Sequence, residues 1–463
     1  MRRGHMRRAL GAAFLATVLN LSGAAAEVVL TPDQLTKAAV VALESGDAAR
    51  ALAYADALVG RNPADFTAQL VRARALRDLG RNRDARDAAW DAVNAAEAED
   101  EKYAGAMVMA QVQSSSGRKT LAQYWLRRAV ELAPNQVLET RAIRDFKYLR
   151  TTNPWSTRLT FSVTPDSNIN DGSARETSFL NYELTELLFG EQVEYQLTGA
   201  ALALPGIEYT LGLDTRYRVH QTGTSAHDLF LKGDLRHYTL TEEARRTAPG
   251  VSGDDFAFAS VFAGYGYRWL NQKGRGETAL RVDAGHSWYG GSNYADYLRA
   301  SVYHAYIVNP RTKLGASLNG ERQMGIAAPD LDTAKISMWG GHRLQNGHSV
   351  FWSATGAQAT SSLASEEFTE IQMRGSFVWA QPVFGATAQF GMGLRTRDYD
   401  VSPHSADGRR DDEISADLTL VFKQLDYHGF NPTVTIYGSQ KNSNIALYES
   451  NKLGINFGIQ SAF

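Results

Sequence analysis

Apolar and polar residues alternate in run after run of the chain from Ile207 to Phe463. In residues 207–219, Ile, Tyr and Leu fill one set of alternate positions, while Glu, Asp and Arg fill the other. A period of two predicts β-strands, because successive side chains of a strand point to opposite faces. One further run precedes this region, and together the runs predict fourteen strands, near residues 157–166, 207–221, 226–240, 255–269, 275–290, 294–308, 311–325, 331–344, 348–360, 365–380, 383–400, 410–424, 431–443 and 449–463.

Fourteen strands that close on one another enclose a space too wide for side chains to fill, since about eight strands already give a packed or ligand-sized interior. The polar faces would then line water, and the apolar faces would need lipid. The runs reach about 14–16 residues, which is long for a globular sheet and sufficient for a tilted membrane crossing. The pattern therefore predicts an antiparallel transmembrane β-barrel. A large soluble all-β domain, with its apolar faces packed together, is the alternative.

Composition narrows the classes of partner. The chain has 463 residues, with 48 Lys and Arg against 50 Asp and Glu, so nothing points to a nucleic-acid partner. It has no cysteine, which excludes disulfides, thiolate chemistry and a lipid on an N-terminal cysteine. Beyond residue 26 there is no run of 18 apolar residues, so we expect no helical membrane span.

Residues 1–26 have the features of a secretory signal peptide. Basic residues at Arg2, Arg3, Arg7 and Arg8 precede an apolar stretch at 9–21, and three alanines follow at 24–26. A membrane anchor is the competing interpretation, but the apolar stretch is short and ends in the small-residue pattern of a cleavage site. An exported strand barrel belongs in the outer membrane of a bacterial envelope, and this is the location that we expect.

Residues 27–150 are rich in alanine at helical spacing and contain three similar segments. The segments begin at Gly46, Gly80 and Gly117, and each continues with small or apolar residues at matching positions. This is the pattern of tetratricopeptide (TPR) repeats, in which small residues let paired helices pack closely. We predict an all-α helical-repeat domain, closed by a capping helix at 141–150, with a concave face suited to a protein partner. A plain helical bundle is the alternative.

The predicted barrel occupies residues 151–463, and a long stretch without clean alternation, 167–206, follows its first strand. We expect this stretch to form a loop or a plug that folds partly into the lumen or contacts a client protein. The other connections alternate between tight turns, as at 222–225, and longer loops, as at 401–409. Outer-membrane barrels have short turns on the periplasmic side and longer loops outside. The helical repeats are therefore expected in the periplasm.

This layout resembles that of the surface lipoprotein assembly modifiers, Slam-type outer-membrane translocators that join periplasmic helical repeats to a fourteen-stranded barrel. The resemblance is also carried by short motifs, among them Trp288–Tyr289–Gly290–Gly291, residues 429–432 and residues 441–445. Its most specific motif follows the first strand and consists of Pro165, Asp166, Ser167, Asn168, Ile169 and Asn170.

The resemblance implies a function and partners. Members of the family move proteins across the outer membrane, so the implied client is an exported lipoprotein or a secreted protein. Outer-membrane lipid and the barrel-assembly machinery are further implied partners, together with a periplasmic chaperone. By similarity to other outer-membrane proteins, the terminal Phe463 is expected to be the barrel-assembly signal, with Phe457 on the same strand. No catalytic, metal-binding or cofactor-binding residue comes with the resemblance.

The residues themselves indicate no enzyme. The sequence lacks a Gly-x-Ser-x-Gly elbow, a His-Glu-x-x-His helix and a phosphate-binding glycine loop. Asp283, His286 and Ser287 lie close in sequence, but on a strand His286 would face away from the other two. We expect no cofactor.

Two classes of function remain. A translocator would receive its client at the repeats and pass it outward through the barrel. The alternatives are a polysaccharide export porin, which would be expected to carry many more repeats, and a passive diffusion porin, which would have no need of them.

Overall fold

We describe a computed structural model, which covers residues 29–425 and 430–461. The predicted signal peptide, 1–26, and the terminal Phe463 lie outside these residues. The chain forms two compact units, one with the first four helices and one with the remaining helices and all strands. No helix in the covered ranges is long and apolar enough to cross a membrane.

The first part of the chain is helical, as predicted. Each inter-helix glycine named from the sequence, Gly46, Gly80 and Gly117, has a positive φ of 82°, 74° and 74°. Such values favour glycine, which has no Cβ to clash with the preceding backbone. The seven helices are α1 (Pro32–Glu44), α2 (Ala48–Arg61), α3 (Phe66–Asp78), α4 (Asn82–Ala95), α5 (Glu99–Ser115), α6 (Lys119–Glu131) and α7 (Gln136–Thr152).

Alanines make close helix packing possible in this domain. Ala51 and Ala55 of α2, Ala85 of α4 and Ala122 of α6 are completely buried. Ala51, Ala85 and Ala122 occupy the same position of the three sequence segments, so each segment buries a small residue there. The TPR-like prediction is confirmed, and α7 extends further than the capping helix predicted at 141–150.

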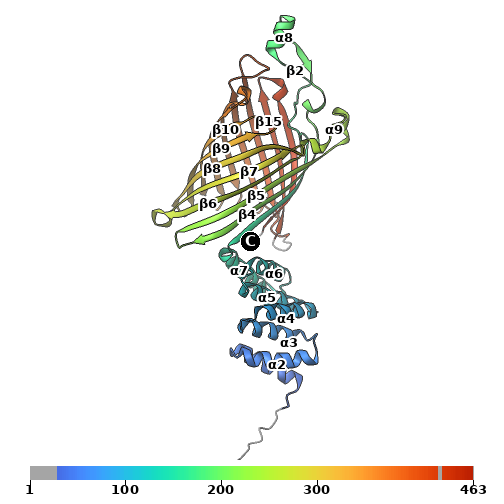
Figure 1. Cartoon of the computed structure of the whole chain (residues 1–463), viewed down its shortest axis with the longest axis vertical. Helices are drawn as coiled ribbons and strands as arrows, with labels where there is room; N and C mark the ends of the chain where they lie inside the picture. The colour runs from blue at the N-terminus through green and yellow to red at the C-terminus, as the bar shows by residue number, and fades with distance from the viewer. Residues whose placement is uncertain (1–28, 426–429, 462–463) are drawn as a thin grey trace, which may run out of the picture. The chain divides into compact units, whose positions relative to one another are not determined.

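The second part closes into an antiparallel barrel of fourteen strands, in which β1 lies between β4 and β16. All fourteen predicted strands are present (Figure 1). They are β1 (Trp155–Asp166), β4 (Gly206–Gln221), β5 (Ser225–Leu240), β6 (Phe258–Asn271), β7 (Gly276–Tyr289), β8 (Ser292–Asn309), β9 (Thr312–Gly325), β10 (Leu331–Arg343), β11 (Ser349–Ser361), β12 (Phe368–Val378), β13 (Thr387–Tyr399), β14 (Arg409–Val421), β15 (Phe430–Ser443) and β16 (Ser450–Ser461).

Some strand ends differ from the predicted ones for local reasons. The fourth strand was expected from residue 255, but β6 begins at Phe258 because a short 3-10 turn, η2 (Gly253–Phe256), precedes it. Asp255 stabilises that turn by accepting a hydrogen bond from the Ser252 backbone N–H at 2.8 Å. A capping side chain thus competes with the strand for the same backbone groups.

The connections at the two ends of the barrel differ in length. At the end where β1 begins, two residues join β8 to β9 and three join β4 to β5. At the opposite end, residues 241–257 join β5 to β6 and contain the short helix α9 (Glu242–Thr247), while 400–408 join β13 to β14. These four connections follow the expected asymmetry between short turns and longer loops. Two others do not, since residues 290–291 join β7 to β8 at the end where β1 finishes and residues 379–386 join β12 to β13 at the end where β1 begins. We call the end with the longer loops the loop end.

The stretch 167–206 belongs to the loop end and has structure of its own. It contains a small antiparallel pair, β2 (Thr177–Phe179) and β3 (Glu194–Gln196), with the helix α8 (Tyr182–Phe189) between them. Figure 1 shows α8 and β2 standing beyond the ends of the neighbouring barrel strands. The base of the stretch packs within the barrel mouth, where Ile169 and Leu204 are buried against Tyr238 and Leu240 of β5.

Candidate functional site

The polar face of the barrel wall is the face that lines the lumen. Arg374 of β12 reaches across β13 to form an ion pair with Asp417 of β14, and it passes directly over Gly391. A Cβ at Gly391 would lie 2.3 Å from the Arg374 guanidinium, so the ion pair in this position crosses directly over a residue without a side chain. Side chains two strands apart converge in this way on the concave side of a closed sheet. The charged face is therefore internal.

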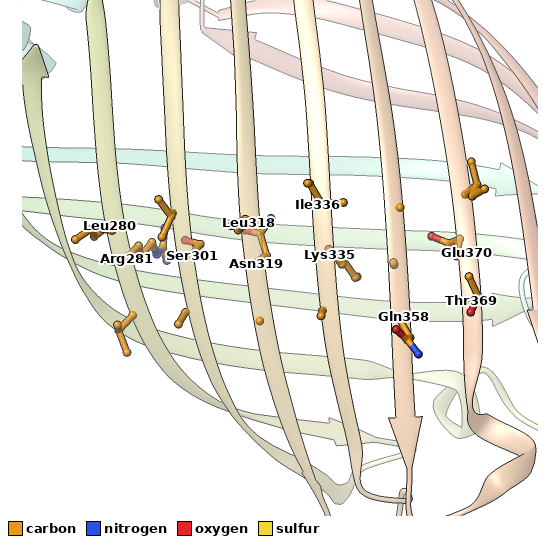
Figure 2. Close-up of a pocket in the computed structure, with 18 residues that line it drawn as sticks. Leu280, Arg281, Ser301, Leu318, Asn319, Lys335, Ile336, Gln358, Thr369 and Glu370 are labelled. Carbon is orange, nitrogen blue, oxygen red and sulfur yellow. The ribbon is translucent and has the colours of Figure 1, made fainter. Parts of the chain in front are cut away.

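The opposite face of the wall is apolar and exposed, as a lipid-facing surface should be. Leu318 and Ile371 are 58% and 57% exposed. Figure 2 shows one level of the wall from β7 to β12, where apolar residues such as Leu280 and Ile336 are sequence neighbours of polar ones such as Arg281. The alternation predicted from the sequence thus separates a lipid-facing surface from a hydrated lumen.

Ion pairs between side chains recur along the lumen wall. They match opposite charges on the same strand or on nearby strands, which suits the polar interior of an outer-membrane barrel. Two lumen lysines, Lys232 and Lys335, form no ion pair with any residue that the structure describes, and both line a wall pocket of about 350 Å³. The pairs include Arg218–Asp228, Arg281–Asp283, Arg299–Glu321, Arg374–Asp417, Arg395–Glu413, Arg397–Glu370 and Arg409–Asp411.

The motif at 165–170 lies where β1 meets β16 at the loop end. Asp166 is buried on the lumen side, where its carboxylate accepts a hydrogen bond from the Tyr437 hydroxyl and lies 3.8 Å from the Lys452 ammonium. Asp166 also accepts a hydrogen bond from the Asn168 backbone N–H at 2.8 Å. A buried carboxylate requires such partners. Asp166 therefore joins β1, β15 and β16 at one point.

Two asparagines of the motif bind backbone groups of distant segments. The fully buried Asn168 donates to the Gly172 carbonyl at 2.9 Å and to the Asn451 carbonyl at 3.4 Å. The Asn170 amide donates to the Leu202 carbonyl at 2.9 Å, and its oxygen accepts from the Leu204 N–H at 2.9 Å. The motif thus fixes both ends of the stretch 167–206. Its role in the structure is to position that stretch.

A second set of contacts ties the stretch to neighbouring loops. The Ser173 hydroxyl donates to the Ala446 carbonyl at 2.7 Å, and the Ser178 hydroxyl accepts from the Leu447 N–H at 3.0 Å. Arg175 forms an ion pair with Glu449. These partners lie about 270 residues away in sequence, so the sequence alone gave no indication of them. Residues 441–445, next to these partners, stand out in the sequence only as part of a family motif.

The seam between β1 and β16 is the least regular in the barrel. β1 pairs with β4 at every position from Trp155 to Asp166, whereas it pairs with β16 only at Ser162, Val163 and Asp166. Pro165 has no N–H to donate to a ladder. Side chains hold the strands together at this level instead. Asn456 donates to the Thr164 hydroxyl at 2.7 Å, and the Leu453 N–H donates to the Ser167 hydroxyl at 2.9 Å.

One of the two predicted barrel-assembly residues can be located. Phe457 lies on β16, is half exposed on the lipid-facing side and stands opposite Val434 of β15 and Val163 of β1. Phe463 lies outside the described residues. The structure therefore shows Phe457 as part of the lipid-facing surface and leaves its role in assembly as a prediction.

His404 is a titratable group of the loop end that contacts the stretch 167–206. It lies in the loop 400–408 and accepts a hydrogen bond from the Asn181 backbone N–H at 3.2 Å through Nδ1. Burial lowers the pKa of His404 from its ordinary value of 6.5, and the nearby Arg409 guanidinium lowers it further. The neutral imidazole is the form that can accept this hydrogen bond.

Other chemistry has no assembled site in the residues described. Asp283 and His286 have different partners, as their opposite positions on the strand predict. His286 contacts Asp296 at 2.7 Å, while Asp283 pairs with Arg281. No group of three or more His, Asp or Glu residues within 29–425 and 430–461 could hold a metal ion.

Three solved structures to which the chain is similar are distant from it. The type III secretion translocator chaperone SycD of Yersinia enterocolitica covers 27% of this chain and 88% of its own, at 18% identity and a TM-score of 0.24. A loop-deleted form of OmpT, an outer membrane protein of Vibrio cholerae, covers 66% and 99%, at 9% identity and a TM-score of 0.34. A bacterial polysaccharide outer membrane secretin covers 66% and 98%, at 8% identity and a TM-score of 0.32. Scores this low carry no argument about function.

Comparison with curated proteins gives no match. A family comparison does give one: the surface lipoprotein assembly modifier family matches residues 155–463, about two thirds of the chain. The matched range begins at the first residue of β1 and includes every barrel strand. Family and fold together support an outer-membrane location and a translocator or porin-like role, and neither belongs to a known class of enzyme. The chain is a member of the surface lipoprotein assembly modifier family.

Proposed function

We propose that this protein is an outer-membrane translocator that receives a protein client in the periplasm and delivers it to the cell surface or beyond. The observation that carries the proposal is the closed barrel of fourteen strands with a charge-lined lumen, preceded in the chain by helical repeats. A barrel of this strand number has room for more than small solutes. The client would be a surface lipoprotein or a secreted protein.

The repeats are the part proposed to receive the client. Stacked helix pairs of this kind present a concave surface to peptides and proteins. The signal peptide and the even strand number support a periplasmic position, because both ends of a barrel with paired strands lie on one side of the membrane. A periplasmic chaperone is a further proposed partner, since the client must cross the periplasm without aggregating.

Assembly of the barrel itself is proposed to depend on its last strand. Phe463 and Phe457 would be read by the barrel-assembly machinery before β16 pairs with its neighbours. Deleting Phe463 should lower the amount of heat-modifiable barrel in outer-membrane fractions, while the chain level in the periplasm rises. Unchanged assembly would contradict this role.

The function is tested by comparing surface proteins of cells with and without this chain. Protease added to intact cells releases exposed segments, which are then quantified by mass spectrometry. We expect a small set of lipoproteins or secreted proteins to fall at least tenfold in the surface fraction while their total amount is unchanged. Normal display of all such proteins, with loss of an extracellular polysaccharide, would support the export-porin alternative instead. Normal display with loss only of solute uptake would support a diffusion porin.

A further inference from the structure

The helix α8 exposes an apolar face at the loop end of the barrel. Leu184, Leu187, Leu188 and Phe189 are 53%, 81%, 63% and 61% exposed. They are not on a barrel strand, and Figure 1 shows α8 beyond the ends of those strands. These four residues therefore lie outside the apolar surface of the barrel wall that faces lipid.

The loop 400–408 holds the start of this helix through hydrogen bonds. The backbone N–H of Tyr182 donates to the Pro403 carbonyl at 3.2 Å, and that of Asn181 donates to His404 at 3.2 Å. On the lower side of the helix, Thr185 is almost fully buried and its hydroxyl donates to the Tyr182 carbonyl at 3.1 Å. The helix is thus held with its apolar face outward. Such an exposed apolar face is typical of a surface that binds a partner.

The charge around this face distinguishes between classes of partner. Residues 176–206 contain no Lys or Arg and five Glu, all exposed, at Glu176, Glu183, Glu186, Glu191 and Glu194. Helices that lie on anionic membranes carry Lys and Arg around their apolar face. An acidic border has the opposite effect, because it repels such a surface. It favours a protein whose apolar groove is bordered by Lys and Arg.

We propose that α8 and its five glutamates form a docking surface for the exported client, which meets it with an apolar groove bordered by basic residues. We call this the α8 surface. Its position at the end opposite the start of β1 places it where a client leaves the barrel. The inference rests on the proposed function, and it adds the contact that holds the client after passage.

The test uses variants of α8 that leave the barrel unchanged. Leu187→Ser combined with Leu188→Ser removes the apolar contact, and Glu186→Lys combined with Glu191→Lys reverses the border charge. The control is Leu363→Ser, which removes an exposed leucine (51%) from another loop at the same end. Heat modifiability of each variant reports on barrel assembly.

The readout is the set of surface proteins that disappears when the whole gene is deleted. We expect both α8 variants to lower display of this set at least fivefold, and the control to stay within twofold of the unaltered chain. Unchanged display in the serine variant would overturn the inference and leave the translocator function standing. If deletion of the gene removes no surface protein, the proposed function itself is wrong.

A cross-link identifies what covers the α8 surface. The chain has no cysteine, so Leu187→Cys gives a single thiol for a short bifunctional cross-linker on intact cells. An adduct with a member of the displaced set, lost in the Glu→Lys variant, supports the proposal. Adducts confined to lipopolysaccharide would show a membrane-facing helix, and adducts confined to lumen residues of the barrel would show a closing plug. Either of these two results overturns it.

Discussion

Asp166 shows why the motif that follows the first strand has its particular residues. The carboxylate is buried on the lumen side of the wall and therefore needs polar partners. Tyr437 and Lys452 supply these from β15 and β16. Asn168 and Asn170 then satisfy backbone groups of a stretch that belongs to no ladder. The motif is a structural junction, and its amide side chains replace the hydrogen bonds that a regular hairpin would provide.

Substituting Tyr437→Phe tests this junction. It removes the hydroxyl that donates to Asp166 and leaves the buried carboxylate under-satisfied, which costs about 1–3 kcal/mol. We expect the barrel to unfold at a lower temperature in detergent, measured as the midpoint of the heat-induced shift in gel mobility. Tyr209→Phe on β4 is the control, since the structure gives Tyr209 no hydrogen bond through its hydroxyl. Equal midpoints for both variants would contradict the role of Asp166.

Asn168→Ala tests the attachment of the stretch 167–206. The variant loses two donated hydrogen bonds and the bond accepted from the Gly172 N–H at 2.9 Å. We expect protease to cut within 175–196 at least fivefold faster on intact cells, while the barrel stays heat-modifiable. Asn319→Ala, an exposed asparagine of the lumen wall, should leave the cutting rate unchanged. An unaltered rate in Asn168→Ala would show that the other loop contacts suffice.

The residues of this junction were only partly predictable. The sequence identified Pro165 to Asn170 because their composition is typical of a turn and matches a family motif. It could not identify Tyr437 or Lys452, since neither residue stands out on an alternating strand. Contacts that join the two ends of a barrel depend on closure and register, which no local pattern encodes.

Among the elements, the β1–β16 pair is where we expect the barrel to open first. If the observed register continued, Phe161 of β1 would pair with Ile459 of β16. Both residues lie within described strands, but the ladder does not include this pair. A disulfide between Val163→Cys and Phe457→Cys, which face each other across the seam, should close it.

This disulfide should raise the heat-induced transition of the barrel, because it closes a long loop and stabilises by about 2–4 kcal/mol. The control is Val434→Cys with Phe457→Cys, which joins β15 to β16 within one hairpin. It should raise the transition much less, because a hairpin stays paired when the seam opens. The absence of native cysteine keeps both measurements free of other disulfides. Equal gains would contradict opening at β1–β16.

The loop that carries His404 should make attachment of α8 depend on pH. When α8 detaches, the pKa of His404 returns towards 6.5, so the detached state binds a proton more readily than the attached state. Attachment is therefore complete above pH 6.5 and weakens as the pH falls below it, towards the lowered pKa. Protease should cut 175–196 faster at pH 5.5 than at pH 7.5. His404→Gln should remove most of this difference, and a persistent difference would assign the pH effect to another group.

The sequence predicted which strands are present better than it predicted the residues at which they begin. All fourteen strands follow from period-two alternation, because each strand has one face in lipid and one in water. The helix α8 was missed, although Leu184, Leu187 and Leu188 have helical spacing. A helix of eight residues gives too short a pattern to distinguish from a loop. Side-chain caps, such as that of Asp255, decided where strands began.

For the whole molecule, composition, repeat length and alternation predicted helical repeats followed by a strand barrel. The last of the seven N-terminal helices, α7, ends at Thr152, and β1 begins at Trp155. The identity of the client could not be predicted, because a hydrated wall of paired charges suits many polypeptides. The charged side chains of the lumen suit a water-filled channel and do not specify one client.

The orientation of the whole molecule gives the last prediction. The loop 400–408 lies at the loop end, while α5 begins with Glu99 in the helical part that precedes β1. A protease site inserted at 401–409 should be cut on intact cells, because the longer loops face outward. The same site inserted at 97–101 should be cut only after the outer membrane is permeabilised, because the repeats would lie in the periplasm. Heat modifiability of both insertions controls for assembly. Cutting at 97–101 and protection at 401–409 on intact cells would reverse the topology, and with it the direction in which we propose that the client moves.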